Sequence, residues 1–102
     1  MSQVRHFGMF QFKKDITDQQ IATCFDAMRA MQGKIPGLLE VNCGPYDENE
    51  EQLHDGFTHG FVMAFESRTS RDAYLPHPEH ERVKELVIPC LERVTVFDIV
   101  VS

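Results

Sequence analysis

The chain has 102 residues, 42% of them hydrophobic and 25% charged, which is typical of one globular domain (residues 1–102) and not of a disordered chain. Its formal net charge of −6 argues against nucleic-acid binding, because nucleic-acid partners require clustered Lys and Arg. No apolar run approaches the roughly 20 residues of a membrane span, and no signal-peptide pattern is present, so we predict a cytoplasmic protein.

Residues 3–12 (QVRHFGMFQF) alternate in a way that is typical of a β-strand. Apolar side chains occur on both of its faces, which indicates a central strand covered on both sides. Thr17 and Gln20 then form a capping-box pattern that opens a helix, and Gly33 is placed to end it. The apolar stripe of this helix consists of Ile21, Cys24, Phe25, Met28 and Met31.

The middle of the chain predicts two further strands with a loop between them. Residues 38–43 alternate as a second strand, and residues 44–56 are acidic and rich in turn formers, which favours a surface loop. Residues 57–66 predict a third strand. One side of that strand carries Phe57, His59, Phe61, Met63 and Phe65.

The last third of the chain predicts two helices and a final strand. Thr69 and Asp72 suggest a capping box that opens a short helix. Pro78 suits the first turn of another helix, and Pro89 should tighten or kink that helix near its end. The last strand covers residues 93–101. The second of these helices has the apolar stripe Val83, Leu86, Val87, Cys90 and Leu91.

The predicted order β-α-β-β-α-α-β describes an α+β, ferredoxin-like sandwich with helices on one face of a four-stranded sheet. We expect the first and third strands to be parallel central neighbours, which would place His6 and His59 side by side. The other sheet face is largely apolar and has no covering layer of its own. We therefore expect a homodimer in which a second copy covers that face.

Several short motifs stand out along the chain: Arg5-His6, Phe12-Lys13, KIPG at 34–37, GFTH at 56–59, MAFES at 63–67 and, most specifically, AYLPHPEH at 73–80. Together they resemble the stress-responsive A/B-barrel (Dabb) family across nearly the whole chain. The resemblance implies the dimeric α+β barrel as the fold. Most members have no established activity, whereas a plant cyclase of the family catalyses a cofactor-free aldol cyclisation of a linear polyketide.

The resemblance to that cyclase also implies site residues. It implies His80 as general base and Tyr74 as the group that orients it and binds an oxyanion. His6 and His59 match the pocket histidines. On the first helix, Phe25 and Met28 are the expected substrate-binding side chains. Met28 and the neighbouring Cys24 stand where the cyclase has aromatic residues, so the resemblance does not extend to its substrate.

These residues can support acid–base chemistry. An imidazole with a pKa of roughly 6.5 accepts a proton near neutral pH, and a phenol can donate to an enolate oxygen. The structural alternative is that His77 caps a helix, His80 packs beneath it and Tyr74 is a core residue. His6 and His59 are open to the same structural interpretation.

Two functions therefore remain open. The first is a pocket that binds a small apolar or aromatic carbonyl compound, with possible cofactor-free cyclase-like or lyase-like catalysis. The second is a non-catalytic stress-response dimer or oligomer. No metal site is predicted, because His77-x-x-His80 lacks further ligands at zinc spacing. No other cofactor is predicted, and a cofactor-free oxygenase stays possible. The three cysteines fit neither a disulfide framework nor a C-x-x-C pattern and are expected to be reduced interior residues.

Overall fold

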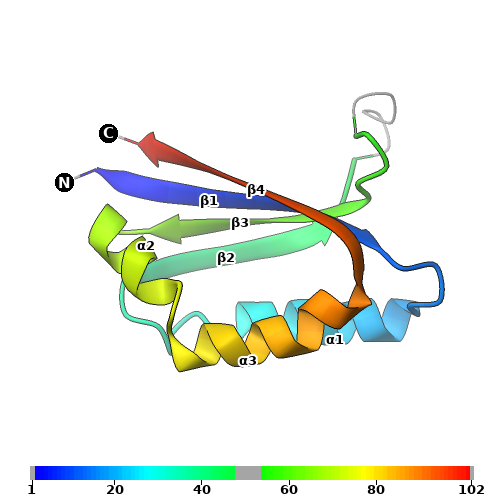
Figure 1. Cartoon of the computed structure of the whole chain (residues 1–102). Helices are drawn as coiled ribbons and strands as arrows, with labels where there is room; N and C mark the ends of the chain where they lie inside the picture. The colour runs from blue at the N-terminus through cyan, green and yellow to red at the C-terminus, as the bar shows by residue number, and fades with distance from the viewer. Residues whose placement is uncertain (1, 48–53, 102) are drawn as a thin grey trace.

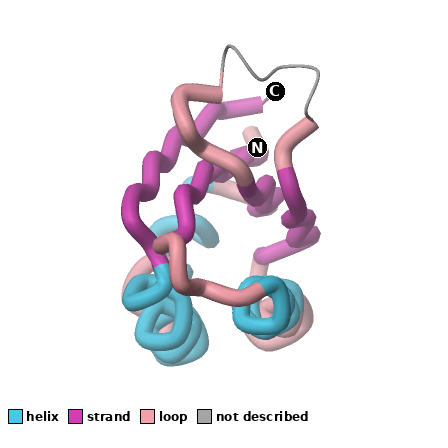
Figure 2. The backbone as a smooth tube through the Cα atoms, turned by 90° about the vertical axis from the view of Figure 1, so that its right-hand side faces the viewer, coloured by secondary structure: helices cyan, strands magenta, loops and turns pink. Residues whose placement is uncertain are grey.

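The computed structural model describes residues 2–47 and 54–101 and forms two layers, a sheet with helices on one of its faces (Figure 1; Figure 2). Part of the loop predicted at 44–56, residues 48–53, lies outside the described residues. The α+β ferredoxin-like prediction is confirmed. The elements are β1 (Gln3–Phe12), α1 (Asp18–Arg29), β2 (Leu38–Pro45), β3 (His59–Phe65), α2 (Arg68–Tyr74), α3 (Pro78–Val87) and β4 (Leu91–Val101), with a 3-10 turn at Ile88–Cys90.

The strand order is β2-β3-β1-β4, and every neighbouring pair is antiparallel. The expectation that the first and third strands are parallel was therefore wrong. Helix α1 returns the chain so that β2 runs in the direction of β1, and the connection to β3 then reverses it. As a result His6 pairs with Met63 and His59 pairs with Phe10, so the two histidines lie toward opposite ends of the sheet.

The helix starts follow side-chain caps. The capping box of α1 is confirmed: the Thr17 hydroxyl accepts from the Gln20 N–H at 3.1 Å, and the Gln20 side chain accepts from the Thr17 N–H at 2.8 Å. Helix α2 begins earlier than predicted. Ser67, not Thr69, is its N-cap and accepts from the Ser70 N–H at 3.1 Å. Ser67 is still extended as the chain leaves β3, which is the backbone conformation that an N-cap requires.

Helix α3 starts and ends as its prolines predict. His77 is its N-cap and accepts the Glu79 N–H at 3.1 Å, and Pro78 occupies the first turn. After Val87 the chain tightens into the 3-10 turn that contains Pro89. None of the described helices has the length and hydropathy that a membrane span requires.

The core lies between the sheet and the helices. Alternate residues of β1, among them Val4, His6 and Phe10, point into it. The opposite face, here called the outer face, has no covering layer within the described chain (Figure 2). Phe97 there is 66% exposed and pairs across the strands with Phe7. The prediction that both faces of β1 are covered therefore does not hold within a single chain.

Candidate active site

An apolar cavity of about 240 Å³ lies between the sheet and the helices. We call it the sheet–helix cavity. Strands β1, β3 and β4 supply one side of it, and the three helices supply the other. Its polar members are one tyrosine, two histidines and one lysine, so any polar recognition inside it depends on a few groups. Its lining is His6, Phe10, Met28, Met31, Phe61, Met63, Tyr74, Leu75, His80, Val83, Lys84, Val87, Ile88, Leu91, Val94 and Val96.

Tyr74 and His80 form a stacked pair on the wall of this cavity. Their ring centroids are 3.9 Å apart, with 24° between the ring planes. Tyr74 is the last residue of α2 and His80 lies in the first turn of α3. The short turn capped by His77 and fixed by Pro78 therefore determines how the two rings meet.

A backbone carbonyl sets the tautomer of His80. The Leu75 oxygen lies 3.1 Å from Nδ1 of His80, and a carbonyl oxygen can only accept, so Nδ1 carries the proton. The other ring nitrogen, Nε2, then holds the lone pair of the neutral ring. Burial lowers the pKa of His80 from 6.5, and this effect outweighs the hydrogen bond to Leu75. The neutral, proton-accepting form is therefore the resting form at neutral pH.

Whereas His80 is a proton acceptor, the Tyr74 hydroxyl is a hydrogen-bond donor. Burial, and then the negative charge of Asp98, raise the pKa of Tyr74 well above its usual range, so the phenol keeps its proton. Every fully enclosed side-chain nitrogen or oxygen in the described chain has a hydrogen-bond partner. The Tyr74 hydroxyl makes no hydrogen bond to residues 2–47 or 54–101, so it is not fully enclosed and is free to donate. Tyr74 itself lines the sheet–helix cavity.

His6 lines the cavity from β1, with its ring centroid 5.8 Å from that of Tyr74. Its Nδ1 is 2.5 Å from Oδ1 of Asp98, and Nη1 of Arg71 donates to Oδ2 of the same carboxylate at 2.5 Å. Burial alone would raise the pKa of Asp98. The hydrogen bonds from His6 and Arg71 outweigh it and lower that pKa, so the carboxylate is ionised.

The structure brings together four of the six predicted site residues. His6, Tyr74, His80 and Met28 all line the sheet–helix cavity. Phe25 and His59 do not line it. They pack against each other elsewhere, with ring centroids 5.8 Å apart.

Asp98 and Arg71 were missed at the sequence level. The sequence does mark Asp98 as unusual, since it is the only charged residue within the apolar run of residues 94–101. The sequence does not mark Arg71 in this way, because charged residues are common on short helices. Arg71 becomes part of the site only because the fold brings it within hydrogen-bond distance of Asp98 on β4.

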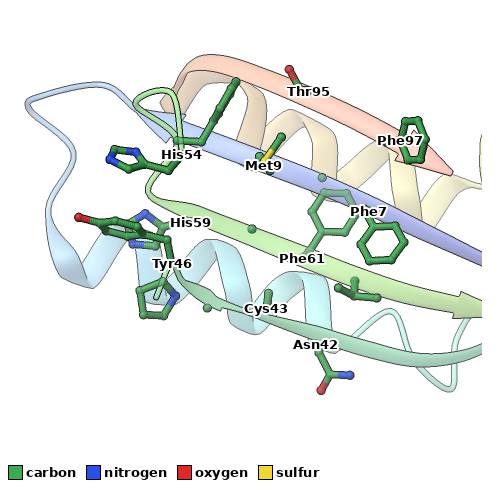
Figure 3. A pocket seen from close by; sticks show the side chains of 16 residues that line it. Phe7, Met9, Asn42, Cys43, Tyr46, His54, His59, Phe61, Thr95 and Phe97 are labelled. Atoms are coloured by element: carbon green, nitrogen blue, oxygen red, sulfur yellow. The ribbon is translucent and has the colours of Figure 1, made fainter. Parts of the chain in front are cut away.

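A second concavity, here called the outer-face hollow, lies on the outer face of the sheet. It is wide and has a volume of about 530 Å³. Figure 3 shows Phe7, Met9, Thr95 and Phe97 at this hollow, with Tyr46, His54 and His59 at one end. It is a surface depression bordered by exposed apolar side chains, in contrast to the sheet–helix cavity between the two layers.

The expectation of interior cysteines holds in full only for Cys24. All three are free thiols, and Cys24 is fully buried while Cys43 and Cys90 are partly buried. Burial, and then the neighbouring Cys90, raise the pKa of Cys24 to about 11, which keeps it an unreactive thiol. Within residues 2–47 and 54–101, no cluster of three or more His, Cys, Asp or Glu is placed to hold a metal ion.

Comparison with known proteins gives one family over nearly the whole chain. Residues 4–101 match the family described as Stress responsive A/B Barrel Domain. The chain is 27% identical over 95 residues to the stress-response A/B barrel domain-containing protein HS1 of Arabidopsis thaliana, covering 93% of this chain and 86% of that protein. It is also 27% identical over 95 residues to olivetolic acid cyclase of Cannabis sativa, covering 93% of each.

Solved structures show the same fold. Hydroxynitrile lyase from Passiflora edulis superposes with a TM-score of 0.88 at 22% identity, over 98% of this chain and 94% of that one. A dimeric ferredoxin-like protein of unknown function from Jannaschia superposes with a TM-score of 0.82 at 23% identity, over 95% and 97%. The family match over residues 4–101, together with the shared fold, shows that the chain belongs to the stress-responsive A/B barrel domain (Dabb) family.

Proposed function

We propose that the protein is a homodimer that binds a small apolar or aromatic carbonyl compound in the sheet–helix cavity. There it removes a proton from the carbon next to the carbonyl, without a cofactor. The observation that carries this proposal is the stacked Tyr74–His80 pair on the wall of an otherwise apolar cavity. A partly buried neutral base beside a buried protonated donor is an arrangement that suits enolisation.

The proposed step uses two atoms of this chain. Nε2 of His80 takes the proton as the C–H bond breaks, and the electron pair moves onto the carbonyl oxygen. The Tyr74 hydroxyl donates a hydrogen bond to that oxygen, where negative charge develops. The resulting enolate can then form or break a neighbouring bond. The name of one similar protein, olivetolic acid cyclase, favours a bond-forming reaction of this kind.

The cavity lining determines the class of ligand. Nearly all of its surface is apolar side chain, so the body of the ligand must be apolar or aromatic. Leu75, Ile88 and Val96 line the cavity and are also partly exposed to solvent, which makes them the apolar rim of its entrance.

The outer face supports the dimer. Phe7 pairs across the strands with both Val62 and Phe97, which makes a continuous apolar row on that face. Met9 and Phe97 are 43% and 66% exposed, and such a contiguous patch is unfavourable in water unless another surface covers it. The Jannaschia neighbour is described as dimeric, which favours a second copy as the cover.

The test is hydrogen–deuterium exchange at the methyl group of acetophenone in D₂O, followed by ¹H NMR. The protein should accelerate the exchange, and both His80→Gln and Tyr74→Phe should reduce that acceleration about 100-fold. His54→Gln is the matched control, because His54 lies outside the cavity lining and should leave the rate unchanged. A His80→Gln protein that folds and exchanges at the wild-type rate would exclude His80 as the base.

The alternative is a non-catalytic stress-response dimer. The exposed outer face favours it equally, because a dimer needs only that face. The two functions separate on ligand binding. Titration with acetophenone should shift the ¹⁵N–¹H signals of Leu75 and Lys84 if the cavity is a ligand site, and a dimer that shows no such shifts supports the alternative.

A further inference from the structure

Three side chains that are distant in the sequence form one connected chain beside the cavity: Arg71, Asp98 and His6. We propose that His6 is a second acid–base group of the site, which donates a proton to the carbonyl oxygen while His80 takes the proton from carbon. Asp98 and Arg71 position His6 for this role. The inference rests on the proposed enolisation and adds a proton donor to it.

The first step of the argument is the orientation of the His6 ring. An ionised carboxylate has no proton to give, so the 2.5 Å contact with Asp98 requires that Nδ1 of His6 carries the hydrogen. Arg71 holds the second oxygen of the same carboxylate and so prevents it from turning away. The ring is therefore fixed with Nε2 as the atom that gains and loses a proton.

The second step concerns the surroundings of Nε2 of His6. His6 is only 8% exposed, yet Nε2 makes no hydrogen bond within the described residues. Because no fully enclosed side-chain polar atom of those residues lacks a partner, Nε2 must face open space. His6 lines both the sheet–helix cavity and a smaller outer cavity that Asp98 also lines. Because Nδ1 is bonded to Asp98, our proposal assigns Nε2 to the sheet–helix cavity.

The third step is the difference between the two histidines. His80 is hydrogen-bonded to a neutral carbonyl and is kept neutral by burial. His6 is hydrogen-bonded through Nδ1 to a carboxylate that Arg71 also holds. Two titratable groups held in contrasting environments can divide the roles of acid and base.

The charged groups around His6 are consistent with its role as the acid and that of His80 as the base. Helix α2 presents Arg71 and Tyr74, β4 presents Asp98, and α3 presents His80 and Lys84, whose ammonium group is paired with Glu81 at 2.7 Å. Strand β3 contributes only the rings of Phe61 and Phe65 next to His6. Asp98 is therefore the one carboxylate that contacts His6 among the described residues.

The proton balance of the step is complete. The C–H bond of the ligand breaks and its proton goes to Nε2 of His80, while the Nε2–H bond of protonated His6 breaks and an O–H bond forms on the carbonyl oxygen. The product is a neutral enol, with His80 now charged and His6 neutral. No oxidant, reductant or metal takes part, and the reverse transfers, or exchange with water, restore the starting state.

Asp98→Asn tests this assignment, because it keeps the size of the side chain and removes the charge that holds His6. We expect acetophenone exchange to fall about 100-fold, with the affinity for acetophenone changed less than twofold. Asp72→Asn is the matched control, because Asp72 also pairs with Arg71, at 2.9 Å, but does not contact His6. It should exchange at the wild-type rate.

The outcomes separate the two proposals. If His80→Gln abolishes exchange and Asp98→Asn does not change it, the role of His6 is excluded and the proposed function stands. If neither variant changes the rate, the proposed function fails. If Asp98→Asn does not fold, ¹⁵N NMR of the wild-type imidazoles decides. Nδ1 of His6 must be protonated and acetophenone must shift its Nε2 signal, and an unshifted signal overturns the inference.

Discussion

The environment of His80 determines the pH range in which it can act as a base. Burial lowers its pKa below the ordinary 6.5, with the Leu75 hydrogen bond as a smaller opposing effect. The neutral form therefore persists as the pH falls through 6.5. We predict that the acidic limb of the acetophenone exchange profile has its midpoint below pH 6.5. NMR titration of the His80 ring should give the same midpoint, and a value above 6.5 would contradict the buried-base assignment.

The same shift has a consequence for stability. A group whose pKa is lowered on folding contributes stability that is present above its unfolded pKa and is lost as the pH falls through the folded pKa. Wild-type protein should therefore lose unfolding free energy relative to His80→Gln as the pH is lowered from 7 through 6.5. Urea unfolding of both proteins at each pH measures this difference.

Gly8 shows how closely one residue is tied to the cavity. A Cβ at position 8 would lie 1.9 Å from the ring of Phe61, which lines the sheet–helix cavity. We predict that Gly8→Ala lowers the unfolding free energy by about 1–3 kcal/mol, because the ring must be displaced. Gly44→Ala is the control, since a Cβ there meets nothing within 4 Å. Equal urea midpoints for the two variants would contradict this account.

At the scale of the element, the start of α3 positions His80 against Tyr74. His77 caps the helix two residues after Leu75, whose carbonyl fixes His80. We predict that His77→Ala costs about 1 kcal/mol of unfolding free energy, because the Glu79 N–H loses its acceptor. His77→Ser restores a capping oxygen and should recover most of the loss. Thermal unfolding of the three proteins checks this, and an unchanged His77→Ala midpoint would show that the cap is not stabilising.

At the scale of the whole molecule, the uncovered outer face is the feature to explain. If a second copy covers it, a charge on that face should prevent assembly, because burying an unpaired carboxylate is costly. We predict that Phe97→Asp converts the dimer to a monomer in light scattering after size exclusion. Leu86→Asp, on α3 in the opposite layer and 41% exposed, should remain dimeric. A dimeric Phe97→Asp protein would place the interface elsewhere.

Local sequence determined most of the elements and, within the candidate site, the proximity of Tyr74 and His80. The capping box of Thr17 and Gln20 and the first-turn position of Pro78 needed only nearby residues, and both were predicted. Tyr74 and His80 are six positions apart and meet across one short turn, so their proximity is also a local property. Ser67 was missed as a cap because Thr69 and Asp72 offered an equally good pattern, and only the end of β3 chose between them.

Long-range pairing decided the rest. His6 and Asp98 are 92 positions apart and become partners only because β1 and β4 lie antiparallel in one register. His6 and His59 were expected to be neighbours, but the direction of β3 separates them. The sequence by itself determined most of the elements, the capping box of α1, the first turn of α3 and the proximity of Tyr74 and His80, because these depend on neighbours along the chain. Strand direction and register depend on the packing of the whole sheet, so only the tertiary structure decided which distant side chains share the cavity.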